Sequence, residues 1–109
     1  MLSNDKEILE CAAKAMGLSL VWVSYCPVPG SNTYPHVKTN DGIRYWNPLD
    51  QDASAFQIAA QLLFSVSFDC GFTRVTDQQE RCTTIRGATP AYGRRAITVA
   101  AAEIGRAMQ

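Results

Sequence analysis

The alternation of apolar and polar positions along the chain predicts three amphipathic helices. The first covers residues 4–16, where a period of about 3.6 residues gathers the apolar side chains on one broad face. Glu10 and Lys14 lie opposite that face. We expect Asn4 to cap the amino end and Gly17 to supply the left-handed residue that ends the helix.

Two further helices follow from the same pattern. The second starts at Asp50 or Asp52, either of which is an expected cap, and apolar residues that include Phe56 and Leu63 predict a core-facing helix. The third begins at Thr89-Pro90, where threonine is the expected N-cap and proline fits the first helical position. Small residues line one face of this third helix, which allows it to approach a sheet closely.

The segments between the first two helices predict strands. Residues 18–25 carry apolar groups on both faces, which is typical of a central strand covered on both sides. A loop with three prolines follows over 26–35. Residues 36–40 and 43–46 then flank Asn40-Asp41-Gly42, and Asp-Gly indicates a hairpin turn whose two central residues have positive φ.

In the second half, alternation over 64–69 predicts a half-buried strand and 81–86 predicts the last strand. Residues 72–75 either continue the first of these or pair with it. The expected order is α-β-β-β-α-β-β-α, an α+β fold in which three helices and a mainly antiparallel sheet form a helix–sheet–helix sandwich. A chain of 109 residues fits a single domain, 1–109.

Charge and hydropathy narrow the class of function. Ten basic residues balance ten acidic ones, so no net field attracts nucleic acid or an anionic membrane. No apolar run approaches the roughly 20 residues of a membrane span, and the polar residues 3–7 interrupt a signal peptide. We therefore expect a cytoplasmic protein with no membrane partner.

The cysteines indicate free thiols. There are four, with no CxxC pair among them: Cys11, Cys26, Cys70 and Cys82. With His36 as the only histidine, no common zinc motif is complete. Reduced thiols in the cytoplasm are the simplest expectation, and one disulfide or a bound metal is the alternative. Cys70 and Cys82 could face each other across a hairpin, so their pairing stays open.

No catalytic set is visible in the sequence. His36 follows a proline and is interpreted as a surface-loop histidine, while helix capping explains Asp50 and Asp52 without acid–base chemistry. No glycine-rich phosphate loop occurs. We therefore expect that the protein is not an enzyme and has no cofactor, catalytic residue or metal ligand.

The run Arg44-Tyr45-Trp46 is one candidate contact with a partner. We interpret Trp46 as packing under the second helix, where it holds the strand-to-helix turn. Tyr45 then points to the opposite face of the strand and is free to contact a partner, with Arg44 beside it.

A group of arginines is the other candidate. Arg86 lies just before the third helix, and Arg94 and Arg95 lie in its first turns. The amino end of a helix is itself favourable to anions, so a phosphate or nucleotide is the ligand that this group would take. Solvated arginines on a strand and a helix face are the simpler interpretation.

Three segments carry a resemblance to a known family: ILECAAKAMGL, YWNPLDQDASAFQIAAQLLFSV and RRAITVAAAEIGRAM. Together they resemble small proteins of tailed phages and prophages of proteobacteria, similar to the phage ABA sandwich domain. The resemblance covers about half of the chain and leaves residues 26–36 and 70–88 unmatched. It implies a helix–sheet–helix sandwich and a phage origin, and it brings no established biochemical activity.

The expected function is binding rather than catalysis. Small phage accessory proteins often bind and block host factors, including defence systems, so the first expected partner is a host protein that this chain inhibits in the host cytoplasm. A homodimer is a further expected arrangement. The alternative function is a nucleotide or nucleic-acid binder that uses Arg86, Arg94 and Arg95.

Overall fold

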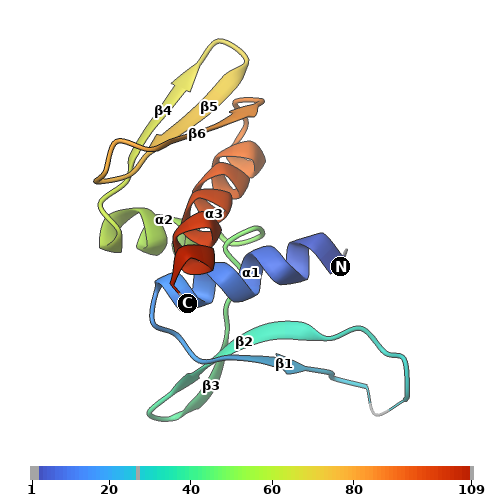
Figure 1. Cartoon of the computed structure of the whole chain (residues 1–109). Helices are drawn as coiled ribbons and strands as arrows, with labels where there is room; N and C mark the ends of the chain where they lie inside the picture. The colour runs from blue at the N-terminus through green and yellow to red at the C-terminus, as the bar shows by residue number, and fades with distance from the viewer. Residues whose placement is uncertain (1–2, 27, 109) are drawn as a thin grey trace.

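The computed structural model describes residues 3–26 and 28–108 of the chain. Three helices lie between two antiparallel sheets of three strands each (Figure 1). Sheet A has the strand order β1-β2-β3 and sheet B the order β4-β5-β6. In chain order the elements are α1 Ser3–Ala15, β1 Leu20–Val23, β2 Tyr34–Thr39, β3 Gly42–Tyr45, α2 Asp52–Gln61, β4 Ser65–Asp69, β5 Phe72–Thr76, β6 Cys82–Arg86 and α3 Pro90–Ala107.

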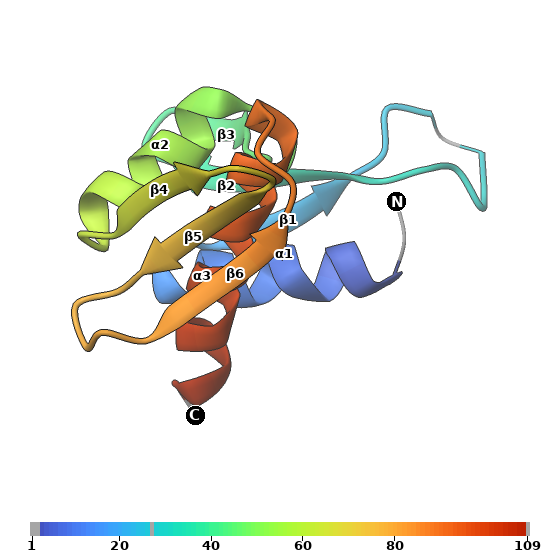
Figure 2. The same cartoon turned by 90° about the horizontal axis from the view of Figure 1, so that it is seen from above.

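The predicted α+β class, the three helices and the antiparallel strands are confirmed. Residues 72–76 form a full strand, so the order is α-β-β-β-α-β-β-β-α, with one strand more than expected. The strands also divide between two sheets that enclose the helices, in place of one sheet between helices (Figures 1 and 2). Each sheet is a meander of consecutive strands, and α2 separates the two meanders along the chain.

The two sheets are joined by a close crossing of α1 and α3. At this crossing Gly105 lies against the backbone of Cys11, and a Cβ atom there would overlap the Cys11 carbonyl oxygen. The neighbouring positions are small and fully or almost fully buried, namely Ala12, Ala13, Ala101 and Ala102. Helix axes in proteins usually lie about 8 to 10 Å apart, and small side chains let two helices pack more closely than that. The small-residue face of α3 therefore packs on a helix as well as on β5 and β6.

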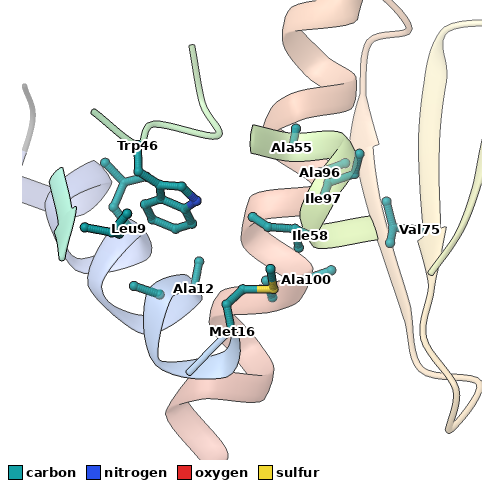
Figure 3. Packing of buried hydrophobic residues seen from close by; sticks show 13 residues of the cluster. Leu9, Ala12, Met16, Trp46, Ala55, Ile58, Val75, Ala96, Ile97 and Ala100 are labelled. Carbon is teal, nitrogen blue, oxygen red and sulfur yellow. The ribbon is translucent and has the colours of Figure 1, made fainter. Parts of the chain in front are cut away.

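One apolar cluster connects both sheets through the helices. It includes Val37 of sheet A and Val75 of sheet B, with Leu9 and Ile58 from the helices between them. Trp46 is buried, as expected, but its ring lies beside Leu9 of α1, whereas the sequence analysis expected it to pack under the second helix (Figure 3). Trp46, the residue that follows β3, is therefore anchored in the same core as α1.

The structure confirms some of the predicted features at the helix ends and corrects one. Gly17, two residues after the end of α1, has φ of +70°, as expected, and Pro90 begins α3 after Thr89. The expected cap of α2 by an aspartate is wrong, because Gln51 occupies the N-cap position. The side-chain oxygen of Gln51 accepts a hydrogen bond from the Ser54 hydroxyl at 2.9 Å. Asp52 is the first residue of α2, where its carboxylate pairs with an arginine of α3.

The structure corrects two details of the predicted strands of sheet A. β1 is an edge strand and β2 is central. Leu20 and Trp22 pack against the core, and all four residues of β1 are only half-buried, so the strand is not covered on both sides as expected. The hairpin between β2 and β3 is confirmed, with Thr39 opposite Gly42. The two central turn residues are Asn40 and Asp41 in place of Asp41 and Gly42, and neither has positive φ. The positive φ of +133° falls on Gly42, the first residue of β3.

The crossing predicts a sharp difference between two glycine substitutions in α3. Gly105→Ala should lower the free energy of unfolding by roughly 3 kcal/mol or more, or prevent folding, because a backbone carbonyl blocks the new methyl group. Gly93→Ala is the matched control, since its Cβ would meet only the ring of Phe68, at 3.0 Å. It should change stability by no more than about 1 kcal/mol, because that partly exposed ring can shift while alanine favours the helix. Urea unfolding measures both, and equal losses would contradict the close crossing.

Candidate binding surfaces

The only histidine is buried in sheet A, which corrects its interpretation as a surface-loop residue. His36 lies in the central strand β2, which begins two residues earlier than predicted, and it is 5% exposed because the rings of Tyr25 and Tyr45 lie against its imidazole. Within residues 3–26 and 28–108, no group of three or more histidine, cysteine, aspartate or glutamate side chains is arranged to hold a metal ion.

His36 is instead the centre of an aromatic cluster on the outer face of sheet A. The Tyr25 and Tyr34 rings stack with centroids 5.4 Å apart. The rings of Tyr25 and Tyr45 meet the imidazole edge-on at 5.7 and 5.6 Å. We call these four residues, Tyr25, Tyr34, His36 and Tyr45, the tyrosine face. Its rings hold one another in place. The helices lie on the opposite face of sheet A (Figure 1).

Hydrogen bonds define the state of the imidazole. Its Nδ1 lies 3.1 Å from the backbone carbonyl of Tyr34, which can only accept, so Nδ1 carries the proton. In the neutral ring Nε2 then accepts a hydrogen bond from the Tyr25 hydroxyl at 2.7 Å. The Tyr45 hydroxyl accepts from the side-chain amide of Asn47 at 3.1 Å. Both ring nitrogens of the buried histidine are therefore satisfied, and Tyr25 is fixed above it.

The candidate pair Arg44 and Tyr45 divides between the two faces of β3. Tyr45 is on the tyrosine face with the exposed side chain of Ile43, while Arg44 points to the side of Val37, which packs on the helices. Tyr25 is 68% exposed and is the most accessible ring of the cluster. The sequence analysis selected Tyr45 but not Tyr25, which it placed at the end of the predicted strand 18–25. The structure ends β1 at Val23 and places Tyr25 in the loop that follows.

The structure does not bring the three candidate arginines together. The Arg94 guanidinium pairs with Asp52 at 2.6 Å and donates to the carbonyl of Leu49 at 3.1 Å. Arg95 pairs with Asp5 of α1 at 3.0 Å. Arg86 lies on the outer face of sheet B, because its neighbour Ile85 packs inward on the core. The sheet therefore separates Arg86 from the two helix arginines.

A second exposed surface is an apolar groove of about 730 Å³ between α2, β4 and the beginning of α3. We call it the α2–β4 groove. It is lined by Phe56, Ala59 and Ala60 of α2, Val66 and Phe68 of β4, and Gly93 and Ile97 of α3, among others. Phe56 and Leu63 were expected to face the core, yet they are 74% and 65% exposed. Helical periodicity could not reveal this, because α2 carries apolar residues on both of its sides.

All four cysteines are free thiols. Cys70 lies in the turn between β4 and β5, whereas Cys82 pairs with Thr76 at the other end of sheet B, so the two do not face each other. Cys26 is distinguished by its electrostatics. The backbone N–H of Val28 and then the Ser31 hydroxyl stabilise its thiolate and lower the pKa of Cys26 below the ordinary thiol value, against a small opposing effect of burial.

Comparison of the chain with protein-family models, with curated protein sequences and with solved structures found no match. The resemblance to the phage ABA sandwich domain stays a prediction. None of the helices in residues 3–26 and 28–108 is both long and apolar enough to cross a membrane.

The placement of the arginines predicts that Arg94 stabilises the fold. Arg94→Ala should lower the free energy of unfolding by about 1 to 2 kcal/mol, because it removes a charged hydrogen bond and leaves the Leu49 carbonyl without its donor. Arg86→Ala, at an exposed strand position, should change it by less than about 0.5 kcal/mol. Denaturant unfolding separates the two, and an unchanged midpoint for Arg94→Ala would rule out this structural role.

The lowered pKa of Cys26 predicts that this thiol is alkylated at a lower pH than an ordinary thiol. Its alkylation rate with iodoacetamide, followed by peptide mass spectrometry, should reach half of its maximum at a lower pH than the rate for a cysteine in a short unstructured peptide. Ser31→Ala should move that pH upward, because one donor to the thiolate is lost. A half-maximal pH at or above that of the peptide cysteine would show that the loop does not stabilise the thiolate.

Proposed function

We propose that this protein acts by binding another protein through the tyrosine face of sheet A. The observation that carries the proposal is the mutual packing of the Tyr25, Tyr34, His36 and Tyr45 rings on an uncovered sheet face, with Tyr25 68% exposed. Tyrosine is enriched among the residues that dominate binding energy at protein interfaces, since it offers a large apolar ring and a polar end.

The fixed positions of the rings in the tyrosine face favour tight binding. Tyr25 is held by its bond to the buried His36 and by stacking on Tyr34, so little side-chain freedom remains to be lost when a partner covers it. The adjoining loop supplies Ser24, Gly30 and Asn32, residue types that make adaptable polar contacts beside rigid aromatic anchors. Rigid rings next to a polar loop are a favourable combination for recognition of a folded protein.

The identity of the partner rests on the resemblance to phage-encoded proteins. A host protein that the chain inhibits in the host cytoplasm is the partner we propose, and proteins of host defence belong to that class. The alternative, a nucleotide or nucleic-acid binder, is the weaker proposal, because acids of this chain pair with Arg94 and Arg95 and the sheet separates them from Arg86.

The experiment compares capture by two variants. Tagged wild type, the double variant Tyr25→Ala with Tyr34→Ala, and the control Phe72→Ala are each incubated with lysate of a proteobacterial host, and stoichiometric partners are identified by mass spectrometry. Phe72 is an exposed aromatic residue of sheet B, away from the tyrosine face. For a partner captured by wild type, we expect the double variant to raise the dissociation constant at least about tenfold and the control to leave it unchanged.

Loss of the partner with Phe72→Ala, or equal capture by all three proteins, would contradict binding through the tyrosine face. Circular dichroism and a thermal unfolding curve of each variant ensure that the comparison concerns folded proteins. Capture that depends on nucleic acid, and is abolished by nuclease treatment, would favour the alternative function.

A further inference from the structure

Helix α2 is apolar on two opposite sides. One side, with Ala55 and Ile58, is buried in the core. The other side exposes Ala53, Phe56 and Ala60, which are spaced three and four residues apart and therefore form one stripe. The exposed side chain of Leu63 follows just after the helix end. A globular helix with a single buried side has one apolar stripe, so a second stripe on the opposite side indicates that α2 can be covered there as well.

The edge strand next to α2 is also without a partner. β4 and β5 are joined by a two-residue turn, so the flanking residues Asp69 and Phe72 form a hydrogen-bonded pair. Because bonded and non-bonded pairs alternate along an antiparallel ladder, the backbone N–H and C=O groups of Val66 and Phe68 point to the free edge. No described residue pairs with them there.

This edge lacks the features that usually protect an exposed strand. Residues 65–68 contain no charge and no proline. The side chains of Val66 and Phe68, whose backbone groups are free, also line the α2–β4 groove. β4 lies at the border of sheet B nearest to α2 (Figure 2), so the edge and the exposed stripe of α2 form one continuous apolar surface.

We infer that this surface is a homodimer interface, in which the β4 strands of two copies pair antiparallel about a two-fold axis at Ser67. Ser67 is the midpoint of β4, so this register pairs the whole strand with its copy. Val66 then lies opposite Phe68 of the second copy, and both have backbone groups that point to the edge. Four backbone hydrogen bonds form, and the two sheets become one sheet of twice the width.

A second copy suits this surface because the surface is complementary to itself. The two-fold axis brings each exposed α2 stripe toward its copy beneath the joined strands, where each can bury the other. Asp69, the one charged residue of β4, falls opposite Ser65 of the second copy, so no like charges meet across the pair. The balanced charge of the chain adds no long-range repulsion between copies.

The inference is independent of the proposed function. The tyrosine face belongs to sheet A, and the dimer surface belongs to sheet B and α2. The dimer would carry two tyrosine faces, each still open to a partner. Failure of one proposal therefore leaves the other intact, and the experiments for the two use different variants.

The first test measures the oligomeric state. Light scattering coupled to gel filtration, over about 1 to 100 μM protein, should give wild type twice the 11.9 kDa mass of the chain at the upper concentrations. Phe56→Asp places one carboxylate from each copy where the two α2 helices meet. It should raise the dimer dissociation constant at least about tenfold. Phe72→Asp, the same change at an exposed position on the outer face of sheet B, should leave it unchanged.

The second test measures the register by cross-linking. In a chain with Cys26, Cys70 and Cys82 changed to serine, Ser67→Cys should form a disulfide between copies on mild oxidation, because non-bonded antiparallel pairs place Cα atoms about 4.5 Å apart. Ser65→Cys is the control, since its two copies would lie roughly 13 Å apart. In the wild-type chain, the backbone amides of Val66 and Phe68 should become better protected from hydrogen exchange as the protein concentration rises, because the proposed strand pairing gives them hydrogen-bond acceptors.

Three results would overturn the inference. The first is a wild-type chain that stays monomeric at all these concentrations. The second is a dimer that Phe56→Asp and Phe72→Asp affect equally, which would place the interface elsewhere. The third is cross-linking by Ser65→Cys in place of Ser67→Cys, which would exclude this register and with it the proposed pairing.

Discussion

The close approach of α1 and α3 is the contact on which the rest of the structure depends. Within residues 3–26 and 28–108 the strands of the two sheets do not pair with each other, and the extensive packing of α1 on α3 connects the two halves of the molecule. Gly105 permits this approach because a side chain there would enter the backbone of α1 at Cys11. With the helices at this separation, Val37 of sheet A and Val75 of sheet B belong to one apolar cluster. A wider crossing would open a cavity between the sheets, where every buried side chain loses contacts.

The same arrangement explains why the molecule has two open surfaces. Each sheet uses one face to cover the helices, so the other face, or its free edge, stays exposed. On sheet A the exposed face carries tyrosine rings ordered around a buried histidine. On sheet B the free edge of β4 adjoins the exposed apolar stripe of α2, with Phe56 74% exposed. The first surface offers hydroxyl groups and rings, while the second offers unpaired backbone groups, so the two suit different partners.

The charged residues mainly support the fold. Arg94 and Arg95 are neighbours in the second turn of α3, yet Arg94 joins the helix to α2 through Asp52 and Arg95 joins it to α1 through Asp5. These pairs lie at the surface, where each contributes modestly to stability. Their larger effect is to orient the start of α3 between two helices. A cluster of arginines in the sequence is therefore not by itself evidence of an anion site, because the acids that neutralise it come from distant parts of the chain.

The sequence by itself determined what depends on neighbouring residues: the three helices, the turn at Gly17, the start of α3 at Pro90 and the hairpin before Gly42. Each of these follows from backbone preferences that act over a few residues. Tertiary structure alone decided that the strands divide into two sheets, that His36 is buried among tyrosines, and that Phe56 points outward. Burial depends on which distant segment covers a side chain, and periodicity shows only that a face is apolar. Both proposed binding surfaces therefore became visible only in the folded chain.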